Sequence, residues 1–465
     1  MAMGKPVRRA IRPEAAAGDS AGQGTASPGR RRWLLAGAAA GLGMAARPAP
    51  AGGTTPGAAP VQLRFGWWGG GDRHKRTLAA IAAFEAAHPG VRIKAEYMGF
   101  NGYLEKLTMQ LVGGTEPDVM QINWAWLAMF SKDGQGFLDL YRHRGRLALD
   151  QLPADDIRMA EVQGRLNGLA PSYSARLFLW NAAAFERAGL PLPDSWEALF
   201  AAGPHFRRVL GERAYPLDGE LYDMLLLAQS FVHQQHGSAY LHPTEPRVAM
   251  TPAALRDWVR CFRRLGDEHV ATPLPYRASL GGAEKPTEQQ PDWVVGRWAG
   301  NYTWDSAIRL RQSTLDGRQR LAIGPSLQRP GVASSGVFGR PSMLFSVSRH
   351  TREAEWAARF VNFLVTDAGA AGILGVTRGI PAARPALDVV LAQNMARPLE
   401  LEAWRQIGAL RAAGRIDRPS PAFEDARMRK FLREVFERVA YGRLGDAEAA
   451  DRLLRHGNAL MARLQ

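Results

Sequence analysis

Alternation of apolar and polar side chains marks two early strands in the chain. Residues 61–67 and 91–97 each place apolar side chains at every second position, with polar or charged side chains between them, which is the period of a strand. Residues 78–84 bring apolar side chains close to one helical face, and His88-Pro89-Gly90 ends that helix. The pattern predicts a strand, a helix and a second strand in this order.

A second helix and a third strand follow. Residues 103–112 have helical apolar spacing, and Gly113 and Gly114 end the helix because glycine readily takes the left-handed conformation of a helix end. The run from Asp118 to Ile122 is short and apolar, as in a parallel strand covered on both faces. The chain from Val61 to Asn123 is therefore predicted to be βαβαβ, with a parallel sheet and right-handed crossovers.

Polar and indole side chains follow the third predicted strand. In open parallel sheets, ligands bind outside the carboxyl ends of the strands. This rule places Gln121, Asn123 and Trp124 at or near a cleft. The two amide side chains offer both donors and acceptors, which suits paired hydroxyl groups. Satisfaction of loop backbone groups is the alternative role for these amides.

The first strand ends in an aromatic, glycine-rich loop, GWWGGG, at residues 66–71. Trp67 and Trp68, together with Trp124, could present flat aromatic faces to a ligand, and Gly70 would let that ligand approach the backbone closely. Core packing is the alternative role for each indole. Strand alternation places Trp67 and Trp68 on opposite faces, so one of them can belong to the core.

The second half of the chain reads as a further lobe. Residues 173–181, YSARLFLWN, are predicted to be a strand that passes between two lobes, after which the sequence is mostly helical. Residues 271–292 are rich in Pro, Gly and charge and are predicted to be a surface loop. Short strands are expected at 321–324 and 342–347.

Two groups of residues in this half are candidates for ligand contacts. In the stretch 296–308, Tyr302 and Trp304 are aromatic, and the carboxylate of Asp305 can accept from two vicinal hydroxyls; the alternative for Asp305 is a helix cap. Arg176 and Arg378 can each bind a ligand carboxylate bidentately, which for the family named below would be that of a uronate, although most arginines are solvated surface groups. Tyr173, at the start of the crossing strand, completes the predicted set.

Charge and composition add an expectation about location. The formal net charge of +15 is typical of nucleic-acid binding at first sight, but Lys and Arg are scattered. Arg30 to Arg32 precede an apolar run at 33–46, and Ala49-Pro50-Ala51 supplies a small-x-small cleavage site. Residues 1–51 are therefore predicted to be a twin-arginine-like export signal cleaved near Ala51, with an uncleaved membrane anchor as the alternative. The single Cys261 rules out an internal disulfide.

These blocks together resemble the extracellular solute-binding proteins of ABC importers, family 1, the carbohydrate-binding branch. The resemblance rests on WWGGGDRHKRTLAAIAAFEAAHPGVRI, GGTEPDVMQINWAWLAMFSKDGQGFLDL, LFLWNAAAFERAGLPLPDSWEAL, GRWAGNYTWDSAI and SVSRHTREAEWAARFVNFLVTDAGA, in this order. The loop at 67–72 and the SKDGQGF turn are most similar to the binding proteins for oligogalacturonides.

The resemblance implies a bilobal α/β protein with the periplasmic-binding-protein-like fold of type II and a ligand cleft between its lobes. The N-terminal lobe would comprise residues 52–172 and 326–372, and the C-terminal lobe 173–325 and 373–465. It also implies a monomeric periplasmic protein with no cofactor, whose hinge closure around an oligosaccharide is recognised by the transmembrane permease subunits.

Three alternatives compete with this interpretation. A secreted polysaccharide lyase or glycoside hydrolase would need an acid and a base, yet Glu284, Glu288 and Asp292 lie in a Pro-rich stretch without a recognisable catalytic frame. His233 and His236 could bind a metal, but no clear carboxylate or cysteine partner accompanies them. A nucleic-acid-binding protein is favoured by charge alone, without a basic-aromatic motif. No catalytic or metal-ligating residue is therefore assigned.

Overall fold

The computed structural model describes residues 60–464. The predicted export signal at residues 1–51 lies outside the described residues. Within the described part, no single helix is both long and apolar enough to cross a membrane. One pair of helices, Ala354–Thr366 and Ala368–Leu374, meets that criterion only when taken together across a 65° bend.

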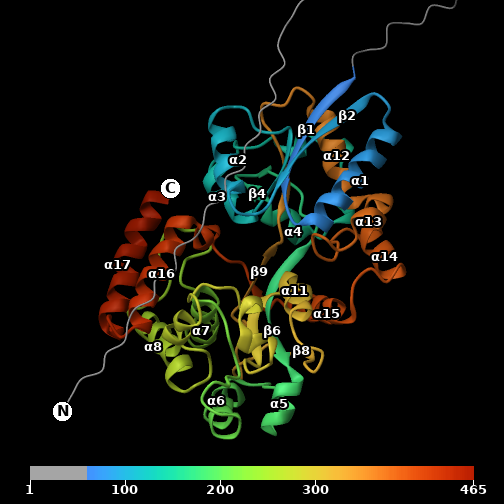
Figure 1. Ribbon diagram of the computed structural model, residues 1–465. Coiled ribbons are helices and arrows are strands. Elements are labelled where there is room, and N and C mark those ends of the chain that lie inside the picture. The colour runs from blue at the N-terminus through green and yellow to red at the C-terminus, as the bar shows by residue number, and fades with distance from the viewer. Residues whose placement is uncertain (1–59, 465) are drawn as a thin grey trace, which may run out of the picture. The chain divides into compact units, whose positions relative to one another are not determined.

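The first lobe is built on a four-stranded sheet of order β10-β3-β1-β2 (Figure 1). β1 pairs in parallel with β2 and with β3, and β10 is antiparallel to β3. The predicted βαβαβ order is thus confirmed, while the antiparallel edge strand comes from much later in the chain. The elements of this lobe are β1 (Val61–Trp68), α1 (Gly71–Ala87), β2 (Val91–Met98), α2 (Tyr103–Val112), β3 (Val119–Ile122), η1 (Trp124–Trp126), α3 (Leu127–Phe130), η2 (Leu140–Arg146), η3 (Leu149–Gln151), α4 (Ala154–Met159), β4 (Glu161–Val162), β5 (Arg165–Leu166), β10 (Leu344–Val347), α12 (Ala354–Thr366), α13 (Ala368–Leu374) and α14 (Arg384–Ala392).

The second lobe is built on β6, whose nine residues run from Tyr173 to Asn181. β6 pairs antiparallel with β9, β7 and β8, and β11 adds to β9 at the edge. Helices α7, α8, α16 and α17 pack against one another beside this sheet (Figure 1). The other elements of this lobe are α5 (Ala182–Ala188), α6 (Trp196–Leu210), α7 (Leu221–His236), α8 (Pro252–Asp267), α9 (Leu274–Ser279), η4 (Thr287–Gln289), α10 (Pro291–Val294), β7 (Gly300–Trp304), η5 (Asp305–Ala307), α11 (Ile308–Ser313), β8 (Leu321–Ile323), β9 (Val337–Pro341), α15 (Pro398–Ala412), β11 (Ile416–Asp417), η6 (Pro421–Glu424), α16 (Ala426–Ala440) and α17 (Asp446–Leu464).

The apolar pattern of the first strand explains its burial. Leu63, Phe65 and Trp67 are fully buried, while Gln62 just before them is exposed and Arg64 between them is half-buried. Phe65 stacks on Trp67 at 4.9 Å between ring centroids and meets Phe360 edge to face at 5.3 Å. Burial of such side chains contributes about 1.5–3 kcal/mol each. Strand β1 is therefore fixed by the helix α12 that covers one face of its sheet.

The sheets divide the chain differently from the predicted lobe boundaries at two places. β9 pairs with β6 in the second sheet, so residues 337–341 belong with the second lobe. α14 packs against α13 and its Ala386 lies in the first core, so the first lobe extends past residue 372. The physical reason is strand pairing: β9 and β10 are consecutive strands, but each completes a different sheet.

The segment 271–292 is not the surface loop that its composition predicts. It contains α9, η4 and α10, and Arg277 within it is fully buried. Arg277 forms a buried ion pair with Asp218 at 2.5 Å, and Thr287 also donates to that carboxylate. A buried charge must be paired, so the segment folds inward around Asp218.

The chain passes between the lobes at residues 172–173, 341–342 and 392–398. Ser172 at the first passage donates its hydroxyl to the Arg378 carbonyl at 2.5 Å and lies 2.7 Å from the Ser342 hydroxyl at the second. These three residues, Ser172, Ser342 and Arg378, which we call the serine knot, link two of the passages to the first-lobe segment between α13 and α14.

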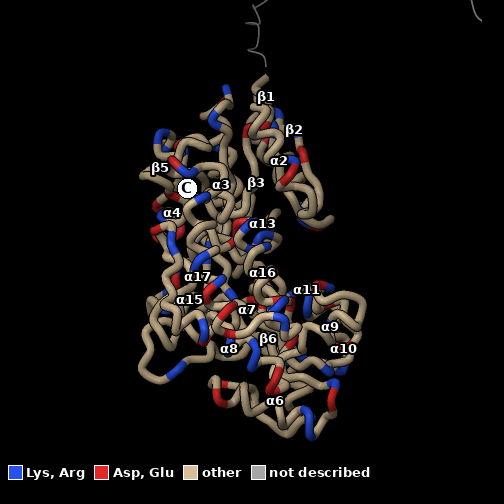
Figure 2. Tube along the Cα trace, turned by 90° about the vertical axis from the view of Figure 1, so that its left-hand side faces the viewer, with Lys and Arg blue, Asp and Glu red and all other residues tan. Residues whose placement is uncertain are grey.

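Charged residues are distributed over both lobes. Figure 2 shows Lys and Arg interspersed with Asp and Glu along the described chain rather than gathered in one stripe. Many basic side chains accordingly have an acidic partner nearby, as in the ion pairs of Arg340 with Glu424 and Arg309 with Glu400.

Candidate ligand-binding cleft

A cleft of about 280 Å³ lies where the two lobes and their connecting segments meet. Its walls combine aromatic rings, three arginines and small hydroxyl side chains. The lining residues are Trp68, Arg73, Phe100, Asn123, Met343 and residues 376–380 from the first lobe, Ser172, Tyr173 and Ser342 at the passages between the lobes, and Ser174, Trp304, Asp305, Ser306, Ile308, Arg340, Glu400 and Trp404 from the second lobe.

A larger cavity, of about 400 Å³, lies inside the second lobe against α8 and α16. Its walls are mainly apolar, with Met224, Phe262 and Leu274 among them. We place the candidate site in the interlobe cleft because several charged and aromatic side chains from both lobes converge there, as in ligand sites.

Six of the twelve predicted contact residues line the cleft, namely Trp68, Asn123, Tyr173, Trp304, Asp305 and Arg378. Gln121 lies directly behind them and is fully buried. Its amide donates to the Trp68 carbonyl at 3.3 Å and accepts from Arg378 Nε at 2.9 Å. Gln121 therefore holds two cleft residues in place rather than facing the cleft itself.

The remaining predicted residues lie elsewhere. Trp67 is stacked on Tyr97, and its Nε1 donates to His74 at 3.1 Å. Trp124 is buried and donates to the Met159 carbonyl at 2.6 Å. Gly70 is the exposed residue before α1. The structure brings none of the three to the cleft wall.

Arg176 and Tyr302 are buried beneath the cleft, in the second sheet. Arg176 Nη1 bonds the Asp223 carboxylate at 2.6 Å, and both side chains are largely shielded from solvent. Tyr302 lies fully buried within 5.7 Å of the same guanidinium. Arg176 already has a carboxylate partner, so it is not available to a ligand.

Arg73 and Arg378 form the cationic wall of the cleft. Arg73 donates to the carbonyls of Thr377 and Trp68. Arg378 donates to Gln121 Oε1 and to Thr77 Oγ1, each at 2.9 Å. All of these acceptors are neutral, and neither arginine forms an ion pair with any residue of the described chain, 60–464.

Burial makes this pair unusual. Desolvation lowers the pKa of Arg73 to about 10. Desolvation, reinforced by the nearby Arg73 charge, lowers the pKa of Arg378 well below its ordinary value. Arg378 is only 6% exposed, and its buried Nη1 has no hydrogen-bond partner among the described residues. Two neighbouring guanidinium groups without a counter-ion constitute a site prepared for an anion.

Aromatic rings surround this wall. Trp68 is 8% exposed and lies edge to face with Phe100, whose ring is 56% exposed, at 5.7 Å. The Trp304 ring carries two guanidinium groups, Arg340 at 4.5 Å and Arg176 at 5.0 Å. The Trp304 ring, predicted to stack on a ligand, therefore also contacts two cations.

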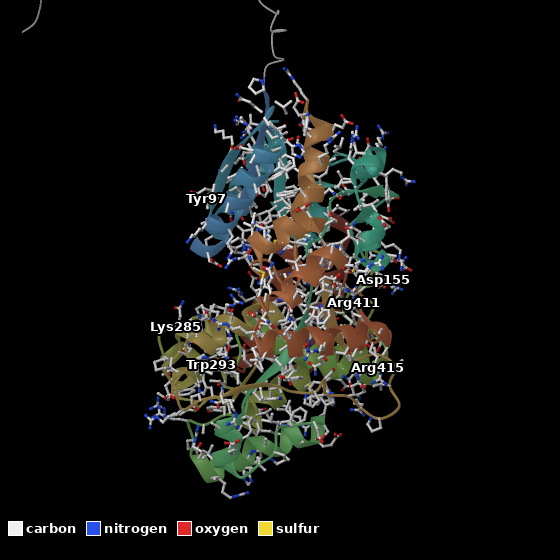
Figure 3. The ribbon with its side chains drawn as sticks, turned by 90° about the vertical axis from the view of Figure 1, so that its right-hand side faces the viewer. Tyr97, Asp155, Lys285, Trp293, Arg411 and Arg415 are labelled. Atoms are coloured by element: carbon white, nitrogen blue, oxygen red, sulfur yellow. The ribbon has the colours of Figure 1, made fainter. Side chains whose placement is uncertain are left out.

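An ion pair between α4 and α15 lies next to the cleft residue Tyr173. Arg411 bonds the Asp156 carboxylate, and its guanidinium lies 3.7 Å from the centroid of the Tyr173 ring. Figure 3 shows Arg411 beside Asp155, where the first lobe meets α15. Arg411 thus covers one face of the Tyr173 ring, while the rest of the Tyr173 side chain lines the cleft.

The sequence did not single out Arg73, Arg340, Phe100 or Trp404. Arg73 lies in the first turn of α1 in a run of charged residues, GDRHKR, which looks like a solvated helix face. The one indication in the sequence that Arg73 could reach a ligand was its closeness to Trp68, where the first strand ends. Arg340 and Trp404 had none, since their positions depend on β9 and α15 reaching the cleft from distant parts of the chain.

The two candidate metal-binding histidines have separate partners. His233 Nδ1 lies 3.6 Å from Asp417, and His236 Nε2 lies 2.9 Å from Asp257. Among residues 60–464, no group of three His, Cys, Asp or Glu side chains could hold a metal ion.

Comparisons with known proteins agree with this geometry. The family model described as bacterial extracellular solute-binding protein matches residues 71–233. The structure of a periplasmic oligogalacturonide-binding protein from Yersinia enterocolitica in complex with saturated digalacturonic acid is 32% identical, with a TM-score of 0.80, over 87% of this chain and 99% of that one. A periplasmic solute-binding protein from Pectobacterium atrosepticum is 33% identical, with a TM-score of 0.81, over 87% and 99%.

Among curated proteins, a putative binding protein from Brucella abortus is 26% identical over 197 residues, or 41% of this chain. The match covers 46% of that protein, so the chain spans about half the length of the curated relative. The two solved structures, in contrast, are matched almost end to end at more than 30% identity, and the expected bilobal α/β fold is confirmed. The chain belongs to the bacterial extracellular solute-binding protein family.

Proposed function

We propose that this protein is the substrate-binding component of an ABC sugar importer and that it captures an acidic, oligogalacturonide-like oligosaccharide in the periplasm. The observation that carries the proposal is the pair Arg73 and Arg378, which lines the cleft without a carboxylate partner in the described chain. The ligand supplies the missing anion.

Electrostatics favours a uronate over a neutral sugar. A buried charge without a partner costs several kcal/mol, and a ligand carboxylate removes that cost. Arg378 has its Nη1 uncommitted, and Arg73 uses its guanidinium only on backbone carbonyls. A ligand carboxylate can therefore accept hydrogen bonds from both Arg73 and Arg378, whereas a hydroxyl group would leave both positive charges uncompensated.

The rest of the cleft suits sugar rings. Trp68 and Phe100 offer apolar surface at the first lobe, and Trp404 offers an indole from the second. Asn123 and Ser306 supply groups that can bond ring hydroxyls. The related Yersinia enterocolitica structure holds saturated digalacturonic acid, which supports the same ligand class here.

The position of the arginine pair suggests how binding is transmitted. Arg378 belongs to the serine knot through its carbonyl, and Ser172 and Ser342 of that knot lie at two passages between the lobes. A ligand held by the Arg378 side chain is thus linked, through the Arg378 carbonyl, to two of the passages that join the lobes. Closure of the lobes would then present the loaded protein, as a monomer, to the transmembrane permease subunits.

The enzyme alternative is less well supported. Glu288 is paired with Arg311, and Asp292 with Arg213 and Arg297. Neither carboxylate lines the cleft. Nucleic-acid binding is disfavoured because charges of both signs are interspersed over the described chain (Figure 2).

The test is calorimetry of the purified protein with di- and trigalacturonate and with neutral oligosaccharides of the same length. Galacturonates should bind, and at a hundredfold excess over Kd they should stabilise the fold by about 2.7 kcal/mol. The ligand should be recovered chemically unchanged. Tight binding of a neutral sugar with no response to galacturonates would refute the acidic ligand, and release of new reducing ends in proportion to protein would indicate an enzyme.

A further inference from the structure

Two carboxyl side chains line the cleft, Asp305 and Glu400, and Glu400 is paired with Arg309. Asp305 directly follows β7, whose last residue, Trp304, is paired with Arg176 of β6. Ser174 of β6 donates its hydroxyl to Asp305 Oδ1. None of the ion pairs formed within residues 60–464 involves Asp305, so its negative charge has no direct partner in the described chain.

The cations around Asp305 are committed to other groups. Arg340 on β9 bonds Glu424 at 2.7 Å and also the carbonyls of Pro341 and Ser342. Arg309 on α11 forms two bonds with Glu400 of α15, each at 2.9 Å. The charged groups that face Asp305 or the same cleft are therefore Arg340 with Glu424, Arg309 with Glu400, Arg176 with Asp223, and the unpaired Arg73 and Arg378.

The environment of Asp305 opposes its ionisation. Burial raises its pKa to about 6, even though Ser174, the backbone N–H groups of Ser306 and Ala175, and the more distant Arg340 charge all act in the other direction. A second carboxylate brought into the cleft by a ligand would oppose ionisation further, because two like charges in a shared desolvated site cannot both ionise freely.

We propose that Asp305 determines specificity by binding the acidic ligand in its protonated form, as a hydrogen-bond donor, so that capture of one ligand takes up one proton. This inference rests on the proposed function. The balance is simple: an ionised Asp305, a solvent proton and an anionic ligand give a neutral Asp305 carboxyl group bonded to the anion. Neutral sugars bring no charge and drive no such uptake.

Replacing Asp305 by asparagine distinguishes two possible roles of its carboxyl group. If Asp305 acted as an ionised acceptor for sugar hydroxyls, an amide in its place would weaken every ligand, and binding would not follow pH. If it acts as a protonated donor, the amide of Asp305→Asn supplies a donor at every pH and carries no charge. The variant then binds an anionic ligand at high pH at least as well as the native protein does.

Calorimetric titration with digalacturonate between pH 5.5 and 8.0 measures this linkage, since the ligand remains ionised throughout that range. Above pH 6, affinity should fall by up to tenfold per pH unit. Titrations at pH 7 in two buffers with different ionisation enthalpies should give an uptake approaching one proton. For Asp305→Asn, both the slope and the uptake should disappear, and the affinity at pH 8.0 should equal or exceed that of the native protein.

His74 is the control, because it is a second titratable side chain beside the cleft residue Arg73. Its Nδ1 accepts from Trp67 Nε1, and desolvation, with the nearby Arg73 and Arg378, lowers its pKa. His74→Gln keeps an acceptor for Trp67 and should retain the native pH slope. A slope lost in His74→Gln but kept in Asp305→Asn would overturn the assignment.

Two further outcomes are decisive. Native protein that binds digalacturonate equally at pH 5.5 and 8.0 without proton uptake refutes the role of Asp305 and leaves the proposed function intact. Protein that binds no galacturonate at any pH, yet binds a neutral oligosaccharide, refutes the acidic ligand of the proposed function, and with it the role of Asp305. The buffer measurement uses native protein, so it remains valid even if Asp305→Asn folds poorly.

Discussion

Replacing Arg378 by methionine should separate ligand affinity from stability. Methionine is of similar length and apolar, so Arg378→Met removes the charge without opening a large cavity. Arg378 is 6% exposed and has no ion-pair partner in the described chain. Removing this charge should greatly weaken the binding of an acidic ligand, because the ligand loses its cationic partner. It should barely change the free energy of unfolding of the free protein, because the charge is desolvated there without compensation.

The magnitudes follow from the contacts. The variant loses two charge-assisted hydrogen bonds, to Gln121 and Thr77, worth about 1.5–3 kcal/mol each. It also removes a desolvation penalty of several kcal/mol. The two effects nearly cancel, so the unfolding free energy should stay within about 2 kcal/mol of the native value. The affinity for digalacturonate should fall by about 2–5 kcal/mol, which is about thirtyfold to several thousandfold in Kd.

Arg176→Met is the matched control. It removes an arginine of equal burial that already has a partner, Asp223 at 2.6 Å. The carboxylate left behind should destabilise the fold by about 3–5 kcal/mol, with little change in the preference for acidic over neutral ligands. Chemical denaturation and calorimetry on both variants measure the two quantities. If Arg378→Met lost stability as Arg176→Met does, or bound digalacturonate like the native protein, the cationic wall would be structural and the reasoning wrong.

Other predictions concern the rings, the pH dependence of stability and export. Trp68→Ala should weaken the binding of acidic and neutral sugars alike by about 1–3 kcal/mol. Trp124→Ala truncates a core indole and should lower the free energy of unfolding by about 3–5 kcal/mol. The folded-state pKa of Asp305 is about 6, above its ordinary 3.8. The native state therefore binds more protons between these values, and the contribution of Asp305 to stability should fall as pH rises through that window, a trend that thermal unfolding of Asp305→Asn should lack. Replacing Arg30, Arg31 and Arg32 by Lys should retain precursor in the cytoplasm, as fractionation would detect; normal export would exclude the twin-arginine route.

Local patterns predicted the first sheet well because each strand carries its own signature. Alternation located β1 and β2, and the glycines after α2 located β3. Alternation also separated Trp67 from Trp68 but could not say which one lies in the core. That choice depends on Tyr97 of the neighbouring strand, whose ring stacks on Trp67 at 4.9 Å.

The cleft itself depends on contacts that no local pattern encodes. Arg176 and Arg378 are equivalent as residue types, yet one meets Asp223, 47 residues away in sequence, and the other meets only neutral groups. Arg73 lies in a charged helical turn and becomes a cleft residue because Thr377, 304 residues away, accepts from it. Sequence could thus nominate arginines for a uronate, but only the fold shows which of them lack a partner.

Gly379 offers a test of the link between the serine knot and the ligand site. Its φ of +97° disfavours any side chain, and a Cβ there would lie 2.4 Å from Ser172 Oγ. Gly379→Ala must therefore displace the hydroxyl that donates to the Arg378 carbonyl. We expect a loss of about 1–3 kcal/mol of stability, and weaker binding of digalacturonate because the Arg378 guanidinium moves with its backbone.

Gly372→Ala is the control for this substitution. Gly372 lies within α13, its φ is not positive, and a Cβ there would come no nearer than 3.8 Å to another side chain. Alanine favours helix, so this variant should gain up to about 1 kcal/mol of stability and bind digalacturonate as the native protein does. Thermal unfolding and calorimetry compare the two. If Gly379→Ala instead matched Gly372→Ala in both measurements, the knot would not fix the position of Arg378, and ligand binding would have to be coupled to the connecting segments by another route.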